Sequence, residues 1–168
     1  MKKSLLIMLA LLFGSFHLNS QTFYSNDFEV WQNNRPTGWN GVNTSLDPLS
    51  IFQSSQSQSG NYSLNIKDQF VSDFKYISTD SIYIHARKTY EISFWAKGKG
   101  GLGLEIYYSN GDFTQIFQEN NINNSDWKNY KCYYYASHIN DSICVELSLG
   151  FSNIFSLDGI FIDNLKIK

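Results

Sequence analysis

The stretch YEISFWA, residues 90–96, carries an apolar residue at positions 90, 92, 94 and 96. The stretches LGLEIYY, residues 102–108, and SICVELSL, residues 142–149, alternate in the same way. Successive side chains of a strand point to opposite faces, so a period of two predicts strands with one buried face. No run of ten or more residues keeps a helical period with capping signals. These stretches therefore predict a fold made of strands.

Similar segments recur along the rest of the chain, separated by turn residues. We expect strands at residues 23–31, 49–53, 62–67, 75–84, 89–97, 102–108, 127–135, 142–151 and 159–167. Glycine and asparagine predict turns at residues 98–101 and 110–112, and polar composition predicts surface loops at residues 53–61 and 120–126. The sequence predicts an all-β, antiparallel β-sandwich of about nine strands.

Composition limits the function classes. A chain of 168 residues with 42% hydrophobic and 17% charged residues forms one domain and is not disordered. Its net charge of -2 excludes the strongly basic surface that nucleic acids require.

The first residues look like a secretory signal. Lys2 and Lys3 precede an apolar run over residues 5–13, followed by small and polar residues. A membrane anchor is the alternative, but this run is about half of the ~20 residues that cross a bilayer, and no later stretch is long enough. We expect residues 1–20 to be a signal peptide cleaved before Gln21, and residues 21–168 to form one secreted or cell-surface domain.

Several segments, in this order, resemble a known superfamily. They are NDFEVW (26–31), RPTGW (35–39), SGNYSLNIK (59–67), YISTDSIYI (76–84), KTYEISFWAKGKG (88–100), SDWKNYKCYYYA (125–136) and IFIDNLKIK (160–168). Together they are similar to the carbohydrate-binding modules of families 4, 9 and 22, which are galactose-binding-like β-jelly rolls. The start of the chain also looks like secreted proteins of Bacteroidetes-type bacteria. The resemblance implies a jelly roll that binds carbohydrate.

The resemblance places three of the expected strands in one sheet, whose outer face would bind the sugar. The residues on that face are Glu91, Ser93, Trp95, Glu105, Tyr107, Glu146 and Ser148. Aromatic planes suit the C–H patches of a sugar ring, and carboxylates accept hydrogen bonds from its hydroxyls. Alternatively, loops cover Trp95 and Tyr107, which then enlarge the core. Tyr133 and Tyr135 form a second contact surface or an ordinary strand exterior, and we expect Trp39 in the core.

The resemblance also implies a structural calcium ion. Relatives tie the first strand and a loop to the last strand through such an ion, and the matching carboxylates here are Asp27, Glu29 and Asp163. Calcium takes six to eight oxygens, so carbonyls of residues 56–61 and water would supply about half. Alternatively, Asp27 and Asp163 accept hydrogen bonds from the backbone at strand ends.

The two cysteines fall on opposite faces of their strands. Cys132 is in phase with core residues, whereas Cys144 is in phase with Glu146 and Ser148. A disulfide would need a bulge or a register change, and two buried free thiols are the alternative.

No catalytic motif such as G-x-S-x-G is present. Glu91, Glu105 and Glu146 would provide the carboxylate pair of a glycosidase, but acceptors for sugar hydroxyls are the simpler interpretation. The expected function is non-catalytic carbohydrate binding after export. The alternative is a structural or adhesive surface protein that binds a protein partner through the same aromatic residues.

Overall fold

The computed structural model describes residues 22–42, 44–45, 50–67, 74–136, 143–152 and 159–168. Its strands are β1 (Tyr24–Asn26), β2 (Trp31–Gln32), β3 (Arg35–Pro36), β4 (Ile51–Ser54), β5 (Ser63–Ile66), β6 (Phe74–Ser78), β7 (Ile82–Ile84), β8 (Thr89–Tyr108), β9 (Phe113–Tyr135), β10 (Ile143–Ser152) and β11 (Ile160–Ile167). None of the described residues is helical, which confirms the all-β prediction. Within them, therefore, no helix is long and apolar enough to cross a bilayer. The predicted signal peptide lies outside the described residues.

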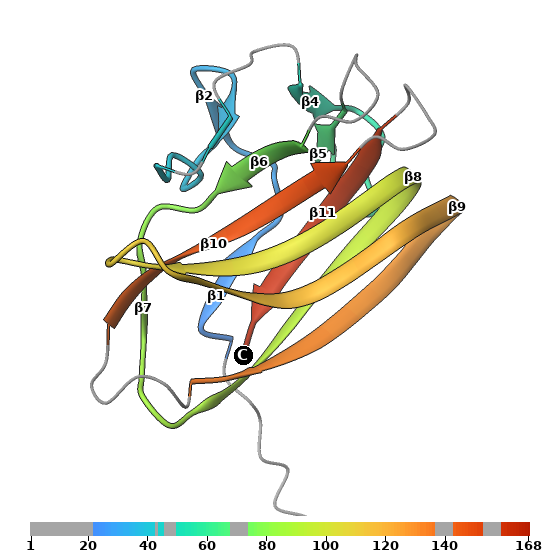
Figure 1. Cartoon of the computed structure of the whole chain (residues 1–168). Coiled ribbons are helices and arrows are strands. Elements are labelled where there is room, and N and C mark those ends of the chain that lie inside the picture. Colours follow the sequence, from blue (N-terminus) through green and yellow to red (C-terminus); the bar gives the residue numbers. More distant parts are fainter. Residues whose placement is uncertain (1–21, 43, 46–49, 68–73, 137–142, 153–158) are drawn as a thin grey trace, which may run out of the picture.

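The strands form two layers that face each other (Figure 1). The β11 layer consists of β1, β4, β5, β11, residues 89–98 of β8 and residues 124–135 of β9. The β10 layer consists of β6, β7, β10, residues 101–108 of β8 and residues 113–119 of β9. All pairings within both layers are antiparallel. This arrangement is the predicted antiparallel sandwich of the jelly-roll type.

The long strands β8 and β9 pass from one layer to the other. The turn predicted at residues 98–101 is wrong, and so is the loop predicted at residues 120–126, because both segments lie inside these strands. The β8–β9 ladder changes register at three places, two of which flank Gly98 and Gly100. Both glycines have positive φ, 116° and 144°. A bulge at glycine bends a strand without ending it, so the hairpin curves here and continues.

The structure confirms some of the other predicted loop and strand boundaries and changes the rest. The loop at residues 53–61 begins after Ser54, where β4 ends, and the turn at residues 110–112 closes with the Tyr108 N–H donating to the Asp112 carbonyl at 2.9 Å. The expected strand at residues 75–84 divides into β6 and β7, and the one at residues 23–31 shortens to β1.

The core lies between the two layers and confirms the alternation. Ile92 and Phe94 of the β11 layer and Leu104 and Leu147 of the β10 layer are at most 1% exposed. Burying each such side chain stabilises the fold by about 2 kcal/mol. Trp39 is fully buried, as predicted.

Candidate functional site

The bend in β8 divides the predicted sugar-binding residues between the two layers. Glu91, Ser93 and Trp95 lie on residues 89–98 of β8 and face outward from the β11 layer, because the residues between them are core. The other four, Glu105, Tyr107, Glu146 and Ser148, face outward from the β10 layer, where Tyr107 is the partner of Glu146 and Glu105 of Ser148. The outer faces of two packed layers point in opposite directions. The structure therefore brings four of the seven residues together.

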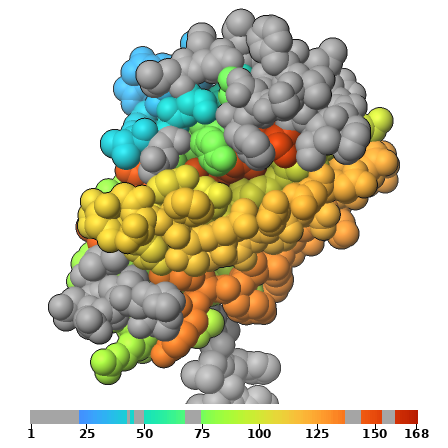
Figure 2. Space-filling model, viewed as in Figure 1, coloured from blue at the N-terminus to red at the C-terminus, as the bar shows by residue number. Residues whose placement is uncertain are grey.

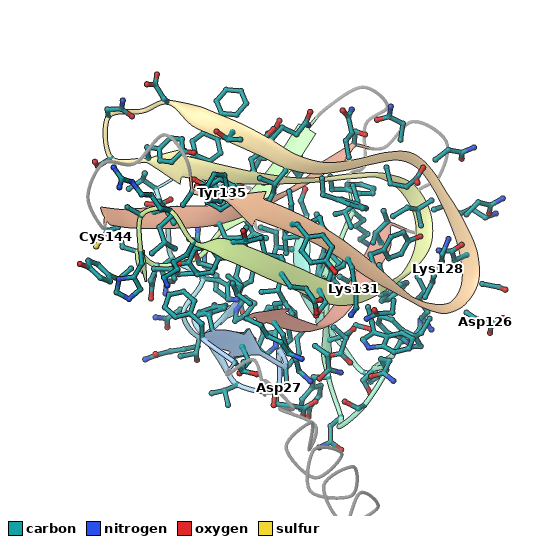
Figure 3. The ribbon with its side chains drawn as sticks, turned by 90° about the horizontal axis from the view of Figure 1, so that it is seen from below. Asp27, Asp126, Lys128, Lys131, Tyr135 and Cys144 are labelled. Carbon is teal, nitrogen blue, oxygen red and sulfur yellow. The ribbon has the colours of Figure 1, made fainter. Side chains whose placement is uncertain are left out.

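Glu91 belongs to a local network on the β11 layer. Its carboxylate accepts hydrogen bonds from the Lys131 ammonium at 3.2 Å and the Tyr133 hydroxyl at 3.1 Å. The hydrogen bond from Lys131 is the main reason that the pKa of Glu91 is lowered. Lys131 and Tyr135 lie along β9 in Figure 3. Ser93 and Trp95 are half-buried on the same face.

The β10 layer carries an open groove on its outer face. Two hollows lie along it: Tyr107 and Glu146 line one of about 220 Å³, and Glu105 lines one of about 120 Å³. The residues that define the groove are Tyr76, Gly103, Glu105, Tyr107, Gln115, Gln118, Glu146 and Gly150. In Figure 2, β8 and the first part of β9 (yellow) lie on one side, β6 (green) and the segment before β4 (cyan) lie on the other, and small parts of β10 (red-orange) show between them.

Glycines open the floor of the groove. Gly103 of β8 and Gly150 of β10 are partners in the ladder, so no side chain stands at either position. The Tyr76 ring lies against Gly150, where an added Cβ would overlap it. At Gly103 an added Cβ would meet only ordinary contacts, the nearest at 3.7 Å. Both glycines line the smaller hollow, and Gly103 has room for a Cβ.

Two tyrosines and a glutamate form the polar centre of the groove. The Tyr107 hydroxyl donates to Glu105 Oε2 at 2.9 Å, and the Tyr107 ring stacks on Phe113 with centroids 5.3 Å apart. Burial, followed by the hydrogen bond to Glu105, raises the pKa of Tyr107 to about 12. The pKa of Tyr76 is also raised, by burial and then by the charge of Glu105. Both phenols therefore remain protonated donors near neutral pH.

Ser148 is not available to a ligand in this structure. It is fully buried together with its ladder partner Ser78, and neither hydroxyl has a hydrogen-bond partner among the described residues. The segment containing Gly41 pairs with the free edge of β6, where the Gly41 N–H donates to the Ser78 carbonyl at 3.0 Å. The Val42 N–H donates to Glu146 Oε1 at 3.2 Å. This segment lies against Ser78 and Glu146, the neighbours of Ser148.

Five of the eight residues that define the groove were not predicted from the sequence: Tyr76, Gly103, Gln115, Gln118 and Gly150. Gly103 and Gly150 share the period of the predicted outward residues, so the alternation held a signal for them. The sequence held no such signal for Gln115 and Gln118, because β9 was not expected to begin at Phe113.

The predicted calcium residues instead hold a loop through amide groups. Asp163 is buried, and its Oδ2 accepts from the N–H groups of Gln58 at 2.8 Å and Ser59 at 3.2 Å. Glu29 Oε1 accepts from the N–H groups of Asn61 at 2.8 Å and Tyr62 at 2.9 Å. These hydrogen bonds join both carboxylates to the loop at residues 56–61 and to Tyr62 beside it.

These donors do not fit a calcium ion, which requires oxygen ligands. Asp27 Oδ1 accepts from the Glu29 N–H at 3.3 Å, and Figure 3 shows Asp27 beside β1. Among the described residues, no group of three acidic, histidine or cysteine side chains is arranged to hold a metal. Calcium stays a prediction of the resemblance. A melting temperature that rises when calcium replaces EDTA would show that the folded chain binds the ion.

The chain is similar to several solved carbohydrate-binding structures. The CBM22-1 xylan-binding domain of Paenibacillus barcinonensis Xyn10C is 17% identical with a TM-score of 0.62, over 88% of this chain and 94% of that one. TmCBM61 in complex with β-1,4-galactotriose is 17% identical with a TM-score of 0.55, over 89% and 99%. A cyclase from Fischerella sp. TAU is 13% identical with a TM-score of 0.59, over 91% and 92%. At such identities the likeness establishes the fold alone.

The family follows from the sequence match. No curated protein is significantly similar to this chain. The profile of the family described as "Carbohydrate binding domain" matches residues 20–145, most of the 168-residue chain. The chain therefore belongs to this family of carbohydrate-binding domains.

Proposed function

We propose that this chain is an exported, non-catalytic module that binds a polysaccharide in the groove of the β10 layer. The observation that carries the proposal is the glycine floor flanked by aromatic rings and hydrogen-bonding side chains.

The groove offers the two kinds of contact that a sugar ring needs. The rings of Tyr107 and Tyr76 provide apolar surface for axial C–H groups. The carboxylates of Glu105 and Glu146 accept hydrogen bonds from hydroxyls, and the side-chain amides of Gln115 and Gln118 both donate and accept them. All of these groups lie on neighbouring strands of one rigid layer, so little ordering is required on binding.

Xylan and β-1,4-galactan are the first ligands to test. Two structures with the same fold carry these in their descriptions, one as a xylan-binding domain and the other as a complex with β-1,4-galactotriose. The fold does not exclude catalysis, since a cyclase shares it. We assign no catalytic role because the family that the chain matches is described as a carbohydrate-binding domain.

Affinity electrophoresis against a panel of neutral polysaccharides tests the proposal. We expect Tyr107→Ala and Tyr76→Ala to weaken retention by roughly tenfold, corresponding to a loss of about 1.4 kcal/mol. Tyr107→Phe keeps the ring but loses the hydrogen bond to Glu105, so it separates stacking from polar contact. No new reducing ends should appear during incubation with the retained polysaccharide.

Tyr133→Ala and Tyr135→Ala are the matched controls. These side chains are 64% and 55% exposed on the β11 layer, so their loss should leave retention unchanged. Equal weakening by both pairs of variants would contradict the groove. If no polysaccharide is retained and a protein partner is bound through the same tyrosines, the adhesive alternative holds instead.

A further inference from the structure

We infer that the outer face of the β11 layer carries a second saccharide site, for an acidic sugar chain whose uronate carboxylates pair with Lys97 and Lys99. This site lies on the opposite layer from the groove and does not depend on it.

A row of side chains crosses this face from strand to strand. Phe52 of β4 is the ladder partner of Asn65 of β5, Asn65 is the partner of Phe161 of β11, and Phe161 is the partner of Lys97 of β8. The alternate residues on these strands, such as Ile160, are core. The row therefore points away from the core, with Asn65 itself only 6% exposed between Phe52 and Phe161; its strands are at the rear of Figure 1.

A hollow of about 370 Å³ adjoins the end of this row. The side chains that line it include Gln56, Lys97, Lys99, Asn123, Asn124 and Phe161. Asn123 and Asn124 belong to the bend of β9, opposite Lys99 and Gly98 of β8. The bend that joins the two layers therefore also shapes this hollow.

The ammonium of Lys97 is held between two aromatic rings. Its Nζ lies 5.2 Å from the centroid of the Trp127 ring and 5.4 Å from that of Phe161. Farther along the row, Lys67 Nζ lies 4.8 Å from the centroid of the Phe52 ring. Contact with a ring face positions an ammonium without neutralising its charge. The two ring contacts therefore position the Lys97 ammonium at the edge of the hollow.

No described carboxylate neutralises these lysines. Lys131 with Glu91 is the ion pair found among the described residues, and it lies elsewhere on β8 and β9. Asp163 shares the face but is buried and accepts three backbone N–H groups. Asp126 is exposed on the outside of β9 where the strand bends (Figure 3). Among the described residues, the charged side chains that line the hollow are therefore the two lysines.

This combination suits a uronic acid better than a neutral sugar. Lys97 and Lys99 pair with carboxylates, the rings of Phe161 and Trp127 meet the C–H face of the sugar, and the amides of Asn123 and Asn124 bind hydroxyls. A neutral glycan would leave the ammonium groups unpaired. A uronate chain repeats the carboxylate, so it can reach both lysines at once.

Polygalacturonate and its methyl-esterified form test the inference, because they share a backbone and differ in charge. Isothermal titration of the full chain should detect the acid and not the ester. Adding salt should weaken binding, since it screens exposed charges. Lys97→Gln with Lys99→Gln keeps much of each side-chain stem and removes both charges, and should weaken binding roughly fivefold or more.

Lys88→Gln with Lys166→Gln is the control with the same net charge. Lys88 comes just before the start of β8, and Lys166 lies near the end of β11. Both side chains are exposed, so this variant should bind as the wild type does. Tyr107→Ala should also bind polygalacturonate normally, which separates this site from the groove. The inference is overturned if the wild type does not bind the acid, if it binds the ester equally well, or if both lysine pairs weaken binding alike.

Discussion

Cys132 and Cys144 have contrasting surroundings. Both are free thiols, which matches the phase argument against a disulfide, although one of them is not buried as expected. Cys132 packs within the core, and burial raises its pKa to about 11. Cys144 is exposed at the margin of the molecule (Figure 3), where it lines one hollow of the groove. Since the thiolate is the reactive form, only the exposed cysteine should react in the native state.

We therefore predict that a disulfide reagent such as DTNB labels one thiol per folded chain near neutral pH. Denaturant should release the second. Absorbance of the liberated thiolate counts both, and Cys144→Ser should abolish the native reaction. Rapid labelling of two thiols in the native protein would contradict the burial of Cys132.

At the scale of elements, the bent hairpin of β8 and β9 builds both sites. The two halves of each strand belong to different layers, and the bend between them requires backbone dihedral angles that glycine alone adopts easily. At Gly98, φ is 116° and an added Cβ would overlap the carbonyl oxygen of Gly159. Gly103 on the same strand has neither constraint, although it forms the floor of the groove.

The contrast between Gly98 and Gly103 predicts that replacement by alanine lowers stability at the first position and weakens binding at the second. Gly98→Ala should lower the free energy of unfolding by about 2 to 4 kcal/mol, because it combines strained φ with a clash against backbone. Gly103→Ala should leave stability nearly unchanged and weaken binding of neutral polysaccharide, because the new methyl group narrows the groove. Urea unfolding and affinity electrophoresis measure the two effects. A Gly98→Ala variant as stable as the wild type would show that the bend does not depend on glycine.

Across the whole molecule, two carboxylates hold one loop between the start and the end of the chain. Glu29 and Asp163 both accept N–H groups from residues 58–62, yet their pKa values move in opposite directions. Burial is the main cause that raises the pKa of Asp163. The hydrogen bond from the Tyr62 N–H is the main cause that lowers the pKa of Glu29.

The signs of these shifts predict how stability depends on pH. A raised pKa means that the folded state binds the proton more tightly, so the contribution of Asp163 is greatest at low pH and is lost as pH rises through its folded pKa. The contribution of Glu29 is present above its unfolded pKa and is lost as pH falls. Urea unfolding at about pH 7 and about pH 4 brackets the ordinary carboxyl range.

Removing each carboxylate isolates its effect. Relative to the wild type, Glu29→Gln should be less stable at about pH 7, with the difference shrinking at about pH 4. Asp163→Asn should lose stability relative to the wild type as pH falls, because it cannot gain the favourable proton. Parallel pH profiles for the wild type and both variants would contradict the two shifts.

The alternation of apolar residues was enough to predict the sandwich and its core. Ile92, Phe94, Leu104 and Leu147 are buried as the period of two requires, and Trp39 is buried with them. The family segments added carbohydrate as the ligand class. Such local patterns are readable because the side-chain direction within a strand depends on the backbone alone.

The grouping of outward residues into sites depended on long-range pairing. The alternation predicts that the side chains of Glu91, Glu105 and Glu146 point away from the core. It does not predict which strands are neighbours or where a strand bends. Glycines at 98 and 100 look like a turn in the sequence, and they become a bend because residues 122–124 pair with them. That pairing sends Glu91 to one face of the sandwich and Glu105 with Glu146 to the other.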